Sequence, residues 1–146
     1  MGMKEYNLIV VYNEKADHLL MCRRSKDPYR GLLNFVGGKI EAGEDGMDAA
    51  YRELREETSI CKEQIVLTHV MDLTYFLDGI QLEVYAGRLI EPVSVCGEEN
   101  ELFWIQKDEN FFDHRNYAGL GNIGHILKEL SFHPEILCPE EAEETV

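Results

Sequence analysis

One amphipathic helix, predicted over residues 45–58, constrains the fold of this chain more than any other segment. Asp45 can cap its N-terminus. One stripe at helical spacing carries Met47, Ala50, Tyr51, Leu54 and Thr58. Such a helix gains most of its stability by packing its stripe against another layer. We therefore expect this helix to lie on a β-sheet.

Short β-branched and aromatic runs predict strands on both sides of this helix. They cover residues 7–12, 18–23, 32–36, 67–76, 81–90 and 102–105. Asp78-Gly79 is a strong hairpin signal between two of these strands, and a final helix is predicted over residues 121–130. Strands before and after one helix, with a second helix at the end, predict an α/β fold in which a mixed sheet lies between helices.

The chain has 146 residues, which suits a single domain. We expect this domain to cover residues 1–132, and residues 133–146 to form an acidic, mobile C-terminal tail. No signal peptide or membrane-spanning run is predicted. Four scattered cysteines without a C-x-x-C motif predict free thiols in a reducing compartment, and hence a cytoplasmic location. A monomer and a homodimer both stay open.

The formal net charge of −14 bears on which partners the chain can bind. Duplex nucleic acid would be repelled by most of such a surface, so we expect no nucleic-acid partner. A phosphate-bearing small molecule would be repelled as well, unless divalent cations held by acidic residues reversed the local sign.

Three glutamates share one face of the predicted helix, because Glu53, Glu56 and Glu57 lie at i, i+3 and i+4. This face lies beside the apolar stripe, so the helix can pack on the sheet and still present three carboxylates to a cleft. Oxygen-rich clusters are what hard cations such as Mg²⁺ require. The alternative is a solvated acidic face softened by Arg52 and Arg55.

A glycine pair, Gly37-Gly38, ends the strand before the helix and begins the loop GKIEAGE. A sharp glycine turn can bring backbone carbonyls and amides close to a bound ion or phosphate. A simple tight turn is the alternative. Glu44 stands just before the helix, within reach of Arg52.

One spaced set of residues runs through this loop and helix: Gly38, Glu44, Arg52-Glu53-Leu54, Glu56-Glu57 and Ser59-Ile60. The set resembles the Nudix box at every fixed position except one, where the family pattern has Gly and this chain has Ser59. A Gly there ends the helix in a left-handed conformation. Ser can adopt that conformation at about 1 kcal/mol, so we expect a slightly shifted helix end and an intact site. Weaker similarity to MutT-type members runs from the first strand to the last helix.

The resemblance implies a Nudix-type α/β/α sandwich and hydrolysis of a nucleoside diphosphate linked to another group. It also implies a divalent metal, usually Mg²⁺, for which Mn²⁺ can substitute. The metal-binding residues that it implies are Glu53, Glu56, Glu57 and the backbone of Gly37 or Gly38. Arg52 would hold the carboxylates by ion pairing with a neighbouring Glu.

Cleavage of a phosphoanhydride also needs a carboxylate that takes a proton from the attacking water. Glu53 is the first candidate. Glu98 is the second, and it is also a candidate metal ligand, because MutT-type proteins carry a metal-site Glu at similar spacing from a Trp, here Trp104. Glu99 and Glu101 compete with Glu98, and each is otherwise an exposed loop acid. The candidate catalytic residues are Glu53, Arg52, Glu56 and Glu98.

Three further positions resemble MutT-type substrate contacts. Arg23 could meet phosphate, Phe35 could stack on a base, and Asn122 offers a donor and an acceptor that suit a purine edge. Their alternatives are a surface cation, a core residue and a helix N-cap. Together they resemble a pocket for an oxidised purine nucleotide such as 8-oxo-dGTP. ADP-ribose, dinucleoside polyphosphates and nucleotide sugars stay open as substrates.

Two other functions on the same fold are the alternatives. A non-catalytic, ligand-sensing Nudix module usually loses carboxylates of the box or carries a DNA-binding domain, whereas this chain keeps Glu53, Glu56 and Glu57. An isomerase of isoprenoid diphosphates needs a specifically placed Cys and Glu, and the cysteines here offer no matching pattern.

Overall fold

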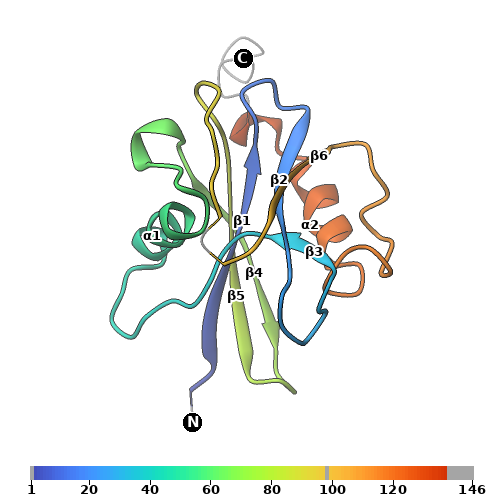
Figure 1. Cartoon of the computed structure of the whole chain (residues 1–146). Coiled ribbons are helices and arrows are strands. Elements are labelled where there is room, and N and C mark those ends of the chain that lie inside the picture. The colour runs from blue at the N-terminus through green and yellow to red at the C-terminus, as the bar shows by residue number, and fades with distance from the viewer. Residues whose placement is uncertain (1, 98, 138–146) are drawn as a thin grey trace.

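The computed structural model describes residues 2–97 and 99–137, which form a β-sheet with α-helices on both of its faces (Figure 1). The strands are β1 (Lys4–Tyr12), β2 (His18–Arg23), β3 (Leu33–Phe35), β4 (Thr68–Tyr75), β5 (Ile80–Arg88) and β6 (Leu102–Gln106). The helices are α1 (Gly46–Thr58) and α2 (Asn122–Leu130), with short 3₁₀ turns η1 (Lys62–Gln64) and η2 (Pro134–Ile136). Every strand and helix expected from the sequence is present.

The sheet is mixed, as predicted, and has the strand order β3-β2-β1-β5-β4. β1 and β5 run parallel over their whole length, from Lys4 opposite Ile80 to Tyr12 opposite Arg88. The other strand pairs are antiparallel, and β6 pairs along β2. Beyond β3 the chain continues along β1 through single bridges, including Ile9–Val36. These bridges bring the glycine pair that follows Val36 against the first strand.

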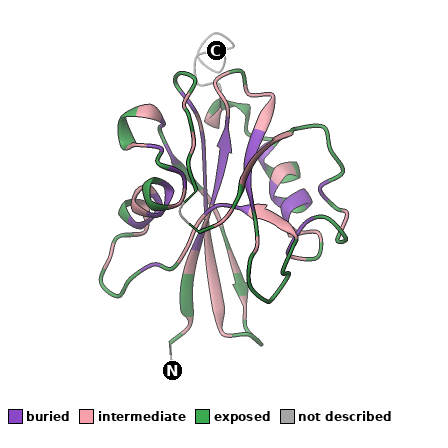
Figure 2. Ribbon diagram, viewed as in Figure 1, coloured by how far each residue is buried: buried purple, intermediate pink, exposed green. Residues whose placement is uncertain are grey.

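Two hydrophobic clusters fill the two sides of the sheet, which confirms the α/β/α sandwich. Successive side chains of a strand point to opposite faces, so Ile9 joins the cluster under α1 whereas Val10 joins the cluster under α2. Figure 2 shows the buried residues concentrated along the sheet and the inner sides of both helices. Complete burial of a side chain such as Leu54 of α1 contributes about 1.5–3 kcal/mol to folding.

Asp45 caps α1 as the sequence predicted, whereas the slightly shifted helix end expected from Ser59 is not found. The Asp45 carboxylate accepts hydrogen bonds from the backbone N–H groups of Met47 and Asp48, at 3.2 and 3.3 Å. At the other end Ser59 is left-handed, with φ of 70°, and its N–H donates to the Arg55 carbonyl at 2.9 Å. Ser59 thus takes the conformation that a Gly would take, and the helix ends at Thr58.

The C-terminal segment packs on the domain in the part that the structure describes. Ile136 and Leu137 are partly buried against the cluster under α2. Residues 138–146, most of the predicted tail, lie outside the described residues. Among residues 2–97 and 99–137, no helix has both the length and the apolar character needed to cross a bilayer.

Candidate functional site

The glycine pair between β3 and α1 makes two close backbone contacts that no other residue type would permit. A Cβ on Gly37 would lie 2.2 Å from the Asn7 carbonyl oxygen, and Gly37 has φ of +151°. A Cβ on Gly38 would lie 2.4 Å from the Glu53 carboxyl group. The turn therefore brings backbone against a carboxylate of α1, which a simple surface turn would not require.

Both polar backbone groups of Gly38 are bound by a single residue of β1. The Gly38 N–H donates to the Asn7 side-chain oxygen at 2.9 Å. The Asn7 N–H in turn donates to the Gly38 carbonyl at 2.8 Å. Because the Gly38 carbonyl already accepts this bond, the Gly37 carbonyl is the better of the two candidate metal ligands.

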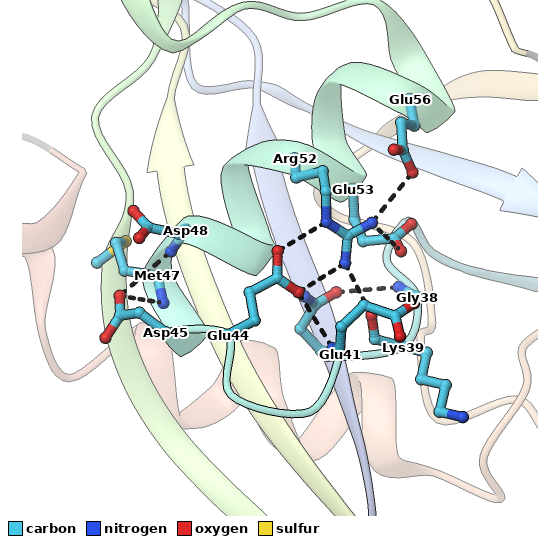
Figure 3. Close-up of polar contacts among 11 residues, drawn as sticks. Gly38, Lys39, Glu41, Glu44, Asp45, Met47, Asp48, Arg52, Glu53 and Glu56 are labelled. Carbon is cyan, nitrogen blue, oxygen red and sulfur yellow. Dashed lines mark hydrogen bonds and ion pairs between the residues drawn. The ribbon is translucent and has the colours of Figure 1, made fainter.

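Arg52 lies at the centre of the charged part of the site, as Figure 3 shows. Its Nε and Nη2 atoms donate to both carboxylate oxygens of Glu44, at 2.8 and 2.9 Å. Its Nη1 atom donates to Glu53 at 2.9 Å and to Glu56 at 3.2 Å. Nη2 also binds the Lys39 carbonyl at 3.0 Å. One guanidinium thus connects the loop, the glycine turn and two of the three glutamates, which is the ion pairing predicted for Arg52.

The two most buried carboxylates around Arg52 have opposite pKa shifts. Hydrogen bonds from Arg52, and one from the Glu41 N–H, lower the pKa of Glu44 to about 2. Burial raises the pKa of Glu53, and it outweighs the contacts with Arg52 that act in the other direction. Glu44 is therefore a fixed anion, whereas Glu53 is the more basic group and better suited to accept a proton.

The residues present fit a divalent cation. Arg52 binds one oxygen each of Glu53 and Glu56, so each keeps a second oxygen for another partner. Glu57 is half-buried and lines the neighbouring cavity. With the Gly37 carbonyl, these side chains offer oxygen donors alone, the set that Mg²⁺ prefers.

A second group of possible ligands lies elsewhere, and sequence reasoning missed it. Among the described residues, ligand atoms of His69, Asp72 and Glu83 come within 4.8 Å of one another. A bulge between His69 and Met71 brings His69 and Asp72 to one face, where regular residues three apart would be opposed. Each member already has a partner: His69 Nε2 lies 2.6 Å from Asp72, and the Tyr85 hydroxyl donates to Glu83 at 2.6 Å.

A cavity of about 1060 Å³ borders the glycine turn. This volume is at the upper end of the range of small-molecule sites in proteins. Its lining includes Gly37, Gly38 and Glu57, and also Arg24 and Lys26 of the loop after β2. In a chain with a net charge of −14, this cavity thus combines two cations with the carboxylate of Glu57.

The structure separates the two arginines at the end of β2. Arg23, the predicted phosphate contact, donates to the Gly31 carbonyl at 2.9 Å and stacks over Phe103. It is not part of the cavity lining, whereas Arg24 is. Arg24 is the first residue of the loop after β2, and its Nε atom donates to the Pro28 carbonyl at 2.6 Å. Sequence reasoning missed Arg24, because no local pattern predicts which side a loop residue faces.

The two predicted base contacts both border the cavity. Phe35 is only 2% exposed and belongs to the core under α2, so little of its ring is accessible. Asn122 is the first residue of α2, and the N-cap is Gly121, which corrects the interpretation of Asn122 as the cap. The Asn122 side-chain amide donates instead to the Tyr75 hydroxyl. Tyr75 and Asn34 also line the cavity and were not predicted from the sequence.

The candidate acids of the loop before β6 are only partly placed. Glu98 lies outside the described residues. Its competitor Glu99 lines the cavity. Glu101 is exposed, and its carbonyl accepts a hydrogen bond from the Arg23 N–H at 3.1 Å. Glu99 is thus the acid of this loop that the described structure brings to the cavity.

A model of the NUDIX domain matches residues 6–122. The ADP-ribose pyrophosphatase of Methanocaldococcus jannaschii is 30% identical over 86 residues, which cover 51% of this chain and 51% of that protein. The chain therefore spans about half the length of this curated relative.

Two solved structures share the fold at low sequence identity. The C. elegans Ap4A hydrolase, in a binary complex, is 24% identical, with a TM-score of 0.69 over 86% of this chain and 95% of that one. The NUDIX domain of Shewanella oneidensis NrtR, in complex with ADP ribose, is 13% identical, with a TM-score of 0.69 over 90% and 88% of the two chains. At these identities the likeness establishes the fold.

Proposed function

The chain belongs to the Nudix family, and on that premise we propose that it hydrolyses a phosphoanhydride bond in a nucleoside diphosphate linked to another group. The observation that carries this proposal is the arrangement around Arg52. One guanidinium orders Glu44, Glu53 and Glu56 beside the glycine turn. These groups adjoin a cavity large enough for a nucleotide.

Nudix hydrolases typically use a divalent metal, and we propose Mg²⁺ here, with Mn²⁺ as a substitute. Glu53, Glu56, Glu57 and the Gly37 carbonyl would hold it. When bound, such a metal neutralises phosphate charge and lowers the pKa of a water molecule. Glu53 then serves as the proton acceptor, since burial already raises the pKa of its carboxyl group. Glu98 stays a second candidate for this role.

For the substrate we propose a purine nucleotide, with 8-oxo-dGTP as the first candidate. The amides of Asn34 and Asn122 line the cavity, and an amide offers both a donor and an acceptor to a purine edge. ADP-ribose and Ap4A, named for the relatives above, also contain purines and are the next candidates. Arg24 and Lys26 would face the phosphates.

The test is product analysis of a nucleotide panel with the purified chain. The panel contains 8-oxo-dGTP, dGTP, ADP-ribose, Ap4A and a pyrimidine nucleotide sugar, each with Mg²⁺ and with excess EDTA. We expect cleavage of at least one purine compound with Mg²⁺ and none with EDTA. Full turnover in EDTA would contradict the metal-dependent mechanism. Calorimetric binding of ADP-ribose without cleavage of any compound would favour the ligand-sensing alternative.

We also propose a cytoplasmic location and a small-molecule partner. Among the described residues Cys22, Cys61 and Cys96 are free thiols, which supports a reducing compartment such as the cytoplasm. The net charge of −14 supports a small-molecule partner over duplex nucleic acid. Gel filtration at several concentrations distinguishes a monomer from a homodimer.

A further inference from the structure

Asn7 is an unusual residue for the centre of a β-strand. It is 1% exposed, and Ile9 on the same face of β1 belongs to the core under α1. Asn is depleted from strands, and an apolar residue would fill such a position more favourably. A polar residue kept here needs a reason other than packing.

The orientation of the Asn7 amide follows from its partner. The Gly38 N–H can only donate, so the atom that it meets at 2.9 Å must be the amide oxygen. The amino group, Nδ2, is therefore on the other side, where it is buried and has no hydrogen-bond partner among the described residues. A buried amino group without a partner lowers stability.

Among the described residues, Glu53 and Thr58 are the other buried polar side chains, and both have hydrogen-bond partners. The Asn100 side-chain oxygen also lacks a partner, but Asn100 as a whole is only partly buried. Thr58 donates to the Leu54 carbonyl at 2.6 Å, and Glu53 accepts from Arg52 at 2.9 Å. Asn7 thus lowers the stability of the fold through its unpaired amino group, yet it makes two hydrogen bonds to Gly38. Such a combination is typical of functional positions.

We propose that Asn7 is a positioning residue for the metal-binding turn. Its side-chain oxygen and its backbone N–H hold both polar groups of Gly38. Its carbonyl oxygen lies against Gly37, 2.2 Å from where a Cβ would be. Asn7 thereby fixes the direction of the Gly37 carbonyl relative to the Glu53 carboxyl group, which packs on Gly38. The proposal rests on the metal site of the proposed function and assigns Asn7 no contact with the reacting atoms.

The test measures binding of Mn²⁺ alone by calorimetry, together with the melting temperature Tm, on the full chain without nucleotide. Asn7→Val removes the amide and suits a strand. We expect Mn²⁺ to bind at least fivefold more weakly, with Tm lowered by less than about 10 °C, because loss of the Gly38 bond is offset by loss of the unpaired amino group. Asn7→Thr, which is closer in volume, serves if the Val variant does not fold.

Two control variants are measured beside Asn7→Val. Ile9→Val trims the next residue on the same face of β1 and should leave Mn²⁺ affinity within twofold, although it also lowers stability. Glu57→Gln removes a proposed ligand and should weaken Mn²⁺ binding by at least as much as Asn7→Val. These controls separate a loss of stability from a loss of the metal site.

Three outcomes would overturn the proposal. The first is a change in Mn²⁺ affinity of less than fivefold in folded Asn7→Val. The second is a fall in Tm of more than about 10 °C in this variant, because general disorder would then explain the weaker binding. The third is that the unaltered protein binds no Mn²⁺. If no compound of the nucleotide panel is cleaved but Asn7→Val still weakens Mn²⁺ binding, only the substrate proposal is overturned.

Discussion

Arg52 binds more carboxylates than one charge can neutralise. Its guanidinium contacts Glu44, Glu53 and Glu56, all within 3.2 Å. Three carboxylates against one guanidinium leave an excess of negative charge on this side of α1, and Glu57 adds to it. Like charges on one helix face are unfavourable. A divalent cation would offset that repulsion, which supports a metal at these residues.

Glu56→Gln and Glu57→Gln test this argument directly. Each change keeps the shape of the side chain and removes a charged ligand. We expect kcat to fall at least about a hundredfold, as for other groups that act through charge at a reacting centre. Thermal stability should be kept or improved because like-charge repulsion falls. Glu63→Gln, an exposed acid on η1, is the control and should change neither value. Normal rates in both site variants would mean that the acidic face is only solvated surface.

Asn122→Ala tests recognition of a purine base. Since Gly121 is the N-cap, removal of the Asn122 amide leaves the helix cap unchanged and breaks the bond to Tyr75. A base that loses its amide partner should bind less tightly by about 1–3 kcal/mol. We therefore expect kcat/KM to fall about 5- to 150-fold for the preferred purine nucleotide and less than about threefold for a pyrimidine one.

Tyr75→Phe is the matched control for this variant. It removes the same inter-element hydrogen bond but leaves the Asn122 amide in the cavity. Its loss of kcat/KM should be smaller than that of Asn122→Ala and similar for both bases. Equal losses for the two bases in Asn122→Ala would show that the amide only connects α2 to β4.

Interactions between residues close in sequence hold both ends of α1. Asp45 caps its N-terminus, and Ser59 ends it in the left-handed region. The loop before it is tied to it by the pair of Glu44 and Arg52. The helix must hold its glutamates at a fixed distance from the glycine turn, and these contacts restrict it to one position along its own axis.

Ser59→Gly should stabilise the protein by about 0.5–1 kcal/mol. A Ser with φ of 70° is strained, and Gly is not. Part of the gain is offset by the greater freedom of Gly in the unfolded chain and by the 3.4 Å bond from the Ser59 hydroxyl to the Cys96 carbonyl. Urea denaturation measures the difference. Ser131→Gly is the matched control, because Ser131 ends α2 with φ of −64°, and there Gly should destabilise.

The pair of Glu44 and Arg52 should make stability depend on pH. The pKa of Glu44 is lowered from 4.5 to about 2 in the folded protein, so ionised Glu44 favours the folded state. This contribution is fully present above pH 4.5 and is lost as the pH falls toward about 2. The stability difference between the unaltered protein and Glu44→Gln should therefore be largest at neutral pH and vanish near pH 2. Glu41→Gln, in the same loop, gives the baseline, and a difference that does not change with pH would contradict the role of the pair.

For the whole molecule, the net charge of −14 makes a divalent cation a stabilising ligand. A metal that binds only the folded state stabilises it by mass action, by about 1.4 kcal/mol at ten times its dissociation constant. MgCl₂ at that concentration should raise Tm by about 3–6 °C. KCl of equal ionic strength is the control for general screening. A KCl shift equal to that of MgCl₂, or a full MgCl₂ shift in a Glu56→Gln/Glu57→Gln double variant, would argue against a specific site.

The amino-acid sequence by itself determined the elements and the acidic face of α1. Helical spacing placed Glu53, Glu56 and Glu57 on one side, and short β-branched and aromatic runs predicted the strands that bury the other side of the helix. These features depend on residues a few positions apart, so local pattern is sufficient to predict them. Arg52 and Glu44 are only 8 residues apart, so their pairing could also be predicted from the sequence.

Only the tertiary structure decided which side chains surround the cavity. Asn7 meets Gly38 from 31 positions away, and Asn122 meets Tyr75 from 47. Such contacts exist because the parallel pairing of β1 with β5 and the return of α2 over the sheet bring distant segments together. No local periodicity predicts this approach of distant segments, because it depends on the order of the strands and on the packing of both faces of the sheet. For the same physical reason, only the folded chain could show that Arg24, and not Arg23, lines the cavity.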